Sequence, residues 1–247
     1  MKGRNKQTNN RRDKVNRGEN KVVKEKFMEE RMDNLPPLKP MNELQKEYIH
    51  NIRTKEVNFA IGYPGTSKTY IPTVIASDML RMNEIKKIYL VRPFVSDSKS
   101  AGFFAGDMIT KSKLWLAPIL DTLYERLGRN NVDYYLEKGA IEPVPLELIK
   151  GRSFKDAFVI VDEAEDLTEK EFIKCITRIG TNCRCCFAGD IRQVDIKSNS
   201  GIQLGYDMAK ENPEFDWGFV DFDQPSDIVR GKVAKDAILG LHRMGKI

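Results

Sequence analysis

The 247-residue sequence is poor in the features that mark membrane, metal-binding and disulfide-linked proteins. No apolar run approaches the roughly eighteen residues of a membrane-spanning helix, and no apolar signal-peptide core is visible. The two histidines, His50 and His242, are far apart and lack companions for a metal or catalytic cluster. These absences favour a soluble, cytoplasmic protein with no membrane partner.

The four cysteines lie close together, at positions 175, 183, 185 and 186. Their spacing lacks the two-residue gaps of zinc-binding motifs, which makes a metal site the less favoured interpretation. Cys175 falls on the apolar face of a predicted helix, and Cys185 and Cys186 fall within a predicted strand. We therefore predict buried free thiols in a reducing compartment.

Positive charge is concentrated at the start of the chain. Residues 1–26 hold ten Lys and Arg against three acidic residues, whereas the whole chain has a net charge of +5, so the remainder is slightly acidic. We predict that residues 1–34 form a basic, disordered tail, which either binds nucleic acid by counterion release or keeps the protein soluble. The remaining residues suffice for one α/β domain with a full core.

Residues 57–70, VNFAIGYPGTSKTY, have the spacing of a phosphate-binding loop, G-x-x-x-x-G-K-[ST], with one departure. An apolar run ends in a glycine-containing turn, where backbone N–H groups can close on phosphate oxygens. The start of the next helix adds partial positive charge. Lys68 can reach the β- and γ-phosphates, and the Thr69 hydroxyl can ligate Mg²⁺. The predicted nucleotide-binding residues are Gly62, Tyr63, Pro64, Gly65, Thr66, Ser67, Lys68 and Thr69.

Two residues around this loop break the expected pattern. Ser67 stands where the motif has glycine, and it costs on the order of 1 kcal/mol if the position needs a positive φ. If the backbone there is helical, only the room beside the phosphates shrinks. Pro72 lies inside the predicted helix, and we expect it to kink the second turn unless the helix starts late.

Residues 157–161 (AFVIV) form a continuous apolar run that ends on Asp162 and Glu163. Such a run predicts a central parallel strand, and its carboxyl end is where an open α/β sheet binds its ligand. One carboxylate can hold Mg²⁺ while its neighbour orients or deprotonates an attacking water. The alternative is a solvated acidic turn, because two more acids follow.

Three further polar residues have a candidate function, and for Gln45 and Arg178 a structural role is the alternative. Gln45 belongs to a predicted capping box with Asn42, or it reads an adenine edge. Gln193 follows a predicted strand and can hydrogen-bond the γ-phosphate or its water. Arg178 lies near the end of a predicted helix, as a partner for the helix dipole or for a phosphate. A last helix is predicted over 226–244, carrying Arg230.

The order and spacing of five motifs resemble superfamily 1 helicases: Gln45, GYPGTSKT (62–69), VRP (91–93), DEAED (162–166) and GDIRQ (189–193). With GFFAGD (102–107), TRIG (177–180) and SDIVRG (226–231), the chain resembles a PhoH-like ATPase, a family common in bacteria and their phages. The resemblance implies an α/β fold of the RecA-like P-loop NTPase type, with a mostly parallel central sheet and helices on both faces. It implies a single RecA-like ATPase domain over 35–247 that binds ATP and Mg²⁺.

The resemblance also implies roles for individual residues. Gln45 becomes an adenine contact, Asp162 and Glu163 the metal and water residues, and Arg230 the arginine finger. Because one RecA-like core offers half a nucleotide cleft, we predict that Arg230 or Arg178 acts in trans. The cleft would then lie at an interface of a ring-like homo-oligomer, expected to be a hexamer.

Three functions remain open from the sequence. The favoured one is an ATPase that couples hydrolysis to binding of single-stranded RNA or DNA, with helicase-like action. A phosphotransferase is the second, although no acceptor-binding motif stands out. A nucleotide-gated binding module with little turnover is the third, because of Ser67 and because the family often has Gln-Asn where this chain has Glu165-Asp166.

Overall fold

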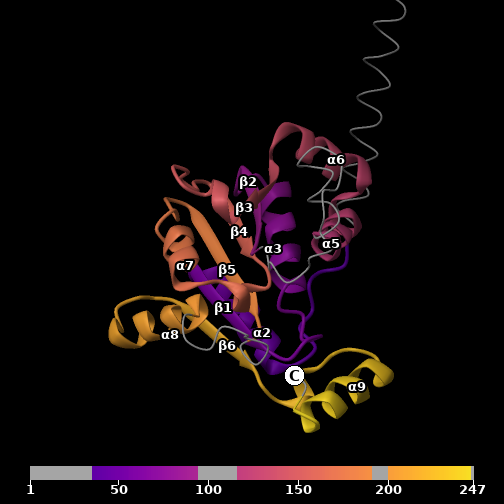
Figure 1. Cartoon of the computed structure of the whole chain (residues 1–247). Helices are drawn as coiled ribbons and strands as arrows, with labels where there is room; N and C mark the ends of the chain where they lie inside the picture. Colours follow the sequence, from indigo (N-terminus) through magenta and orange to yellow (C-terminus); the bar gives the residue numbers. More distant parts are fainter. Residues whose placement is uncertain (1–34, 94–115, 191–199, 246–247) are drawn as a thin grey trace, which may run out of the picture. The chain divides into compact units, whose positions relative to one another are not determined.

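A six-stranded parallel sheet organises the protein in the computed structural model, which describes residues 35–93, 116–190 and 200–245 (Figure 1). The strand order is β3-β2-β4-β5-β1-β6, and all five pairings are parallel. The strands are β1 (Val57–Gly62), β2 (Lys87–Arg92), β3 (Ile141–Pro145), β4 (Ala157–Val161), β5 (Cys183–Gly189) and β6 (Gly218–Phe222).

Helices cover both faces of this sheet, with α3 and α5 on one face and α7 and α8 on the other (Figure 1). The α-helices of the described residues are α2 (Glu43–Thr54), α3 (Tyr70–Arg81), α5 (Ala117–Leu127), α6 (Arg129–Lys138), α7 (Glu169–Ile176), α8 (Gly201–Glu211) and α9 (Lys232–Arg243). The predicted α/β fold with a parallel sheet and helices on both faces is therefore confirmed.

Buried apolar side chains on both sides of the central strands hold these layers together. The ring of Phe59 on β1 stacks on Phe187 of β5 and Phe219 of β6, with centroids 5.0 and 4.8 Å apart. Every residue of β1 and of β4 is buried, as expected of strands covered on both faces. Fully burying one such large apolar side chain contributes about 1.5–3 kcal/mol.

The prediction of buried free thiols is confirmed, and the start of α7 is capped. The Thr168 hydroxyl and the Glu171 carboxylate form a capping box there. All four cysteines are buried free thiols, and burial raises the pKa of Cys183 to about 12. None of the described helices is long and apolar enough to cross a membrane.

The predicted kink at Pro72 is wrong. Helix α3 runs unbroken from Tyr70, which places Pro72 in the first turn, where backbone N–H groups have no partner inside the helix. The Lys68 carbonyl, which an N–H at position 72 would bond, accepts a hydrogen bond from the Tyr48 hydroxyl at 3.3 Å. A proline is therefore tolerated there without distortion.

The helix predicted over 226–244 is shorter than expected. A 3₁₀ turn occupies Pro225–Asp227, and α9 begins only at Lys232. Arg230 consequently lies in a connecting segment and not on a helix. This correction matters for the site, because an extended segment can follow a neighbouring loop closely.

Candidate functional site

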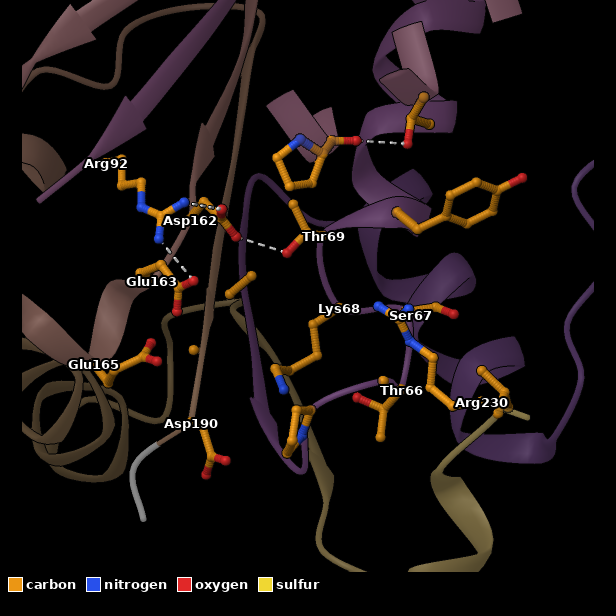
Figure 2. A pocket seen from close by; sticks show the side chains of 18 of the residues that line it. Thr66, Ser67, Lys68, Thr69, Arg92, Asp162, Glu163, Glu165, Asp190 and Arg230 are labelled. Atoms are coloured by element: carbon orange, nitrogen blue, oxygen red, sulfur yellow. Dashed lines mark hydrogen bonds and ion pairs between the residues drawn. The ribbon is translucent and has the colours of Figure 1, made fainter. Parts of the chain in front are cut away.

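A cavity of about 610 Å³ opens at the carboxyl edge of the sheet, a size suited to a nucleotide. The β1–α3 loop forms one wall, and residues just past the ends of β2, β4 and β5 form the other (Figure 2). The polar residues that line the cavity include Lys68, Thr69, Arg92, Asp162, Glu163 and Arg230. This is the edge at which open parallel sheets bind ligands.

The β1–α3 loop has the backbone of a phosphate cradle. Gly62, Gly65 and Ser67 have φ values of 124°, 78° and 73°. At Gly62 a Cβ atom would lie 2.2 Å from the Phe222 carbonyl oxygen, so only glycine fits there. Lys68 Nζ donates to the carbonyls of Gly62 and Tyr63 at 2.5 and 2.7 Å, which keeps the ammonium group inside the loop.

Thr69 stands at the N-terminus of α3 and does not cap the helix with its side chain. Its hydroxyl donates instead to Asp162 Oδ1 at 2.7 Å, across the cavity (Figure 2). The loop and the start of α3 therefore border the same cavity, and the positive end of the helix dipole favours an anion there.

Asp162 is 8 % exposed. Burial raises its pKa above the ordinary value, the negative charge of Glu163 adds to the rise, and the Thr69 hydrogen bond and Arg92 oppose it. A hydroxyl and a carboxylate side by side are oxygen ligands of the kind Mg²⁺ takes from a protein when phosphates and waters complete its shell. The residues present therefore fit magnesium.

Glu163, next to Asp162, forms an ion pair with Arg92 at the end of β2. Arg92 Nη2 lies 3.0 Å from Glu163 Oε1, and Arg92 Nη1 lies 3.7 Å from Asp162 Oδ2. Glu163 also has a left-handed backbone, with φ 51°. Three charged side chains from two adjacent strands thus converge on one side of the cavity (Figure 2).

Arg230 belongs to the same cavity as the phosphate loop of its own chain. The Val229 N–H donates to the Gly65 carbonyl at 3.0 Å, and a Cβ on Gly65 would lie 2.4 Å from Arg230 Cγ. Figure 2 shows the Arg230 side chain crossing the loop towards Ser67. Arg230 therefore lies beside the phosphate loop of its own chain, and the action of an arginine in trans stays a prediction.

Arg178 lies elsewhere. It follows α7 beside the amino end of β4, where its carbonyl accepts from the Phe154 N–H at 2.8 Å. That is the edge of the sheet opposite to the cavity, so Arg178 cannot contact a nucleotide bound in its own chain. Gln193 and the GFFAGD motif (102–107) lie outside the described residues.

Gln45 is buried against the phosphate loop, which the capping interpretation alone does not explain. Its backbone N–H bonds the Asn42 side chain at 2.8 Å, as a helix cap requires. Its side-chain Nε2 donates to the Thr66 carbonyl at 3.2 Å, and its Oε1 accepts from the Met41 N–H at 2.9 Å. Gln45 therefore fastens α2 to the loop.

Arg92 and Glu165 line the cavity although no role was predicted for them. Arg92 ends β2 and Glu165 follows β4, at the edge where ligands bind, and that position is the signal that could have identified them. Glu165 is 4 % exposed, which is unusual for an acidic residue. Burial, and next the charge of Glu163, raise its pKa to about 8.

Comparison with known proteins decides the family. A family description, "PhoH-like protein", matches residues 37–241. The chain belongs to the PhoH-like protein family. It is 37 % identical to a PhoH-like protein of Bacillus subtilis over 68 % of this chain and 52 % of that one. It is 34 % identical to the protein PhoH of Escherichia coli K12 over 73 % of this chain and 51 % of that one.

This PhoH-like chain thus spans about half the length of the curated relatives it matches. Among solved structures, the SWI2/SNF2 ATPase core of Sulfolobus solfataricus in complex with dsDNA aligns with a TM-score of 0.42 and 13 % identity. That alignment covers 78 % of this chain and 48 % of the other, and the likeness is too low to bear on function. Family membership and the observed loop agree on a P-loop type of α/β fold.

Ser67 gives a first prediction for this PhoH-like protein. A side chain at φ 73° is strained, so Ser67→Gly should raise the free energy of unfolding by up to about 1 kcal/mol, after the higher chain entropy of glycine is subtracted. Urea denaturation measures the change. Ser67→Ala keeps the Cβ atom and should give no such gain; equal stabilisation by both variants would contradict the strain.

Glu165 gives a second prediction, for the pH dependence of stability. With a folded pKa of about 8 and an ordinary value of 4.5, the folded chain holds a proton that the unfolded chain releases between these pH values. Stability therefore falls as pH rises through that window, by at most about 1.4 kcal/mol per pH unit. Glu165→Gln should remove this slope and be relatively most stabilising above pH 8.

Urea denaturation of the unmodified chain and Glu165→Gln between pH 5 and pH 9 measures the slope. Glu47→Gln, which alters an exposed acid on α2, is the matched control and should shift all points equally. Parallel curves for the unmodified chain and Glu165→Gln would show that Glu165 is ionised in the folded protein.

Proposed function

We propose that this PhoH-like protein is a magnesium-dependent ATPase whose hydrolysis is coupled to single-stranded RNA or DNA. The observation that carries the proposal is the 2.7 Å hydrogen bond between Thr69 and Asp162, in a cavity that Lys68 and Glu163 also line. It joins the two motifs that a nucleotide-hydrolysing site needs, one for the phosphates and one for the metal and water.

Each residue then has a part. The loop N–H groups and the Lys68 ammonium bind the triphosphate, and Thr69 and Asp162 hold Mg²⁺. When bound, magnesium would neutralise charge on the phosphates. Glu163 orients the attacking water, and Arg230 stabilises negative charge that develops on the transferred phosphoryl group. We assign Gln193 to the same water and Gln45 to the adenine as predictions from the family resemblance.

Nucleic acid is the proposed partner because of charge. The basic surplus of residues 1–26 can neutralise backbone phosphates and so release counterions, which gives affinity without sequence preference. Such binding weakens steeply as salt rises. A ring-like homo-oligomer and a cytoplasmic location also belong to the proposal.

A nucleotide-gated binding module with little turnover is the second candidate. The strained Ser67 and the pairing of Glu163 with Arg92 both favour slow hydrolysis. Phosphate release from ATP by the unmodified chain separates the two candidates, measured with magnesium or EDTA and with or without single-stranded RNA. The ATPase proposal expects magnesium-dependent release that RNA stimulates. Binding without release supports the module, and transfer of label to an acceptor supports a phosphotransferase.

Arg230 gives a third prediction. Arg230→Ala should lower the hydrolysis rate by about 100-fold or more, because an arginine placed on the transferred phosphoryl group supplies large rate factors. Mixing Arg230→Ala with Lys68→Ala subunits tests where the arginine acts. If it acts within its own chain, as its contact with Gly65 suggests, the mixture stays inactive. Recovery of activity on mixing would support the role in trans.

A further inference from the structure

The register of the sheet brings Arg92 and Glu163 into an ion pair. Val91 lies opposite Val161 in the β2–β4 pairing, and the Asp162 N–H donates to the Val91 carbonyl at 2.9 Å. The next residues along each strand therefore leave the sheet side by side. This juxtaposition brings the Arg92 guanidinium to the two carboxylates.

The ion pair is partly shielded from water, and the Arg92 guanidinium contacts the Glu163 carboxylate directly. The side chain of Arg92 is 28 % exposed, and that of Glu163 is 42 % exposed. The left-handed backbone of Glu163 costs on the order of 1 kcal/mol for a residue that is not glycine. Strain of this kind persists where surrounding contacts hold it, and it is frequent at active sites and in switch segments.

The Arg92 guanidinium donates to one oxygen of the Glu163 carboxylate and so fixes the direction in which that carboxylate can accept from a water molecule. We propose that Arg92 is a positioning residue that holds the Glu163 carboxylate in a resting arrangement, and that a phosphate group competing for Arg92 releases it. The inference rests on the proposed role of Glu163 in hydrolysis. A phosphate is the natural competitor, because the guanidinium fork binds phosphate and carboxylate alike. The phosphate can come from a nucleic acid or from the nucleotide itself.

Arg92→Gln tests the proposal in solution. Without nucleic acid, its phosphate-release rate should rise about two- to fivefold, the factor that a partly exposed ion pair can hold back. The effect should fall on kcat, with little change in KM for ATP. Arg92→Lys should give an intermediate rate, since one ammonium group cannot serve both carboxylates.

Lys87→Gln is the matched control. Lys87 lies at the other end of the same strand and pairs with Glu142 at 3.2 Å, away from the cavity. Its loss should leave the rate unchanged. The same rates measured with single-stranded RNA identify the source of the phosphate. If Arg92→Gln is no longer stimulated by RNA, the nucleic acid is the group that releases the ion pair. If Arg92→Gln is still stimulated, the nucleotide is the group that releases it. Both results support the proposal when the basal rate rises.

A second measurement does not depend on hydrolysis. Thermal unfolding midpoints of the nucleotide-free unmodified chain, Arg92→Gln, Glu163→Gln and the double variant form a cycle. The two changes should be non-additive, with the double variant less destabilised than the sum predicts. This measurement tests the ion pair even if the unmodified chain releases no phosphate. That outcome would contradict the proposed function but not the ion pair.

Two results would overturn the inference. A fall in the rate of Arg92→Gln comparable to that of Glu163→Gln would mean that Arg92 stabilises the transition state. An unchanged rate together with additive midpoints would mean that the pair neither restrains Glu163 nor persists in solution.

Discussion

Replacement of Lys68 by alanine is expected to weaken ATP binding by about 10–100-fold and to lower hydrolysis by about 1000-fold. A charge-assisted hydrogen bond contributes about 1.5–3 kcal/mol, which accounts for the loss of affinity. The larger loss in rate follows because the negative charge near the ammonium group grows in the transition state. Equilibrium binding of a fluorescent ATP analogue and single-turnover hydrolysis measure the two effects.

The structural consequence of the same change is modest but must be measured. Lys68 also closes the loop through the carbonyls of Gly62 and Tyr63, so a small fall in the thermal midpoint is expected. Lys46→Ala is the matched control, because Lys46 is an exposed lysine on α2 that pairs only locally with Glu43 at 3.1 Å. ATP affinity unchanged in Lys68→Ala would remove the basis of the nucleotide site.

Replacement of Glu163 by glutamine is expected to lower hydrolysis by about 10²–10⁴-fold while ATP affinity changes little. Glutamine keeps the size of the side chain and removes the charge, so it can no longer orient or deprotonate a water as a base. The left-handed backbone is retained because the residue changes only beyond its Cγ. Phosphate release and binding of an ATP analogue separate the chemical step from affinity.

Glu169→Gln provides the control for this second variant. Glu169 lies in the first turn of α7, outside the cavity, and its replacement should not change the rate. Full activity in Glu163→Gln would move the water-activating role to another acid of the cavity, such as Glu165.

The chemistry of the site was readable from the sequence wherever it depends on neighbours along the chain. The phosphate loop is a local structure, in which glycines, a lysine and a helix start act within eight residues. Asp162 and Glu163 follow a fully apolar strand, and the end of such a strand is a ligand-binding edge in any parallel sheet. The capping box at Thr168 is equally local. For these features, residue order alone sets the geometry.

Other features depended on strand order and register, which residue order does not reveal. Arg92 meets Glu163 because β2 and β4 are neighbours, and Arg230 lies over Gly65 because the segment after β6 turns back along the phosphate loop. The sequence allowed either a positive φ or a helical backbone at Ser67, and the folded loop has the positive φ. Side-chain contacts between distant segments are set by how the sheet is assembled, and they place Arg92 and Arg230 at the cavity and Arg178 away from it.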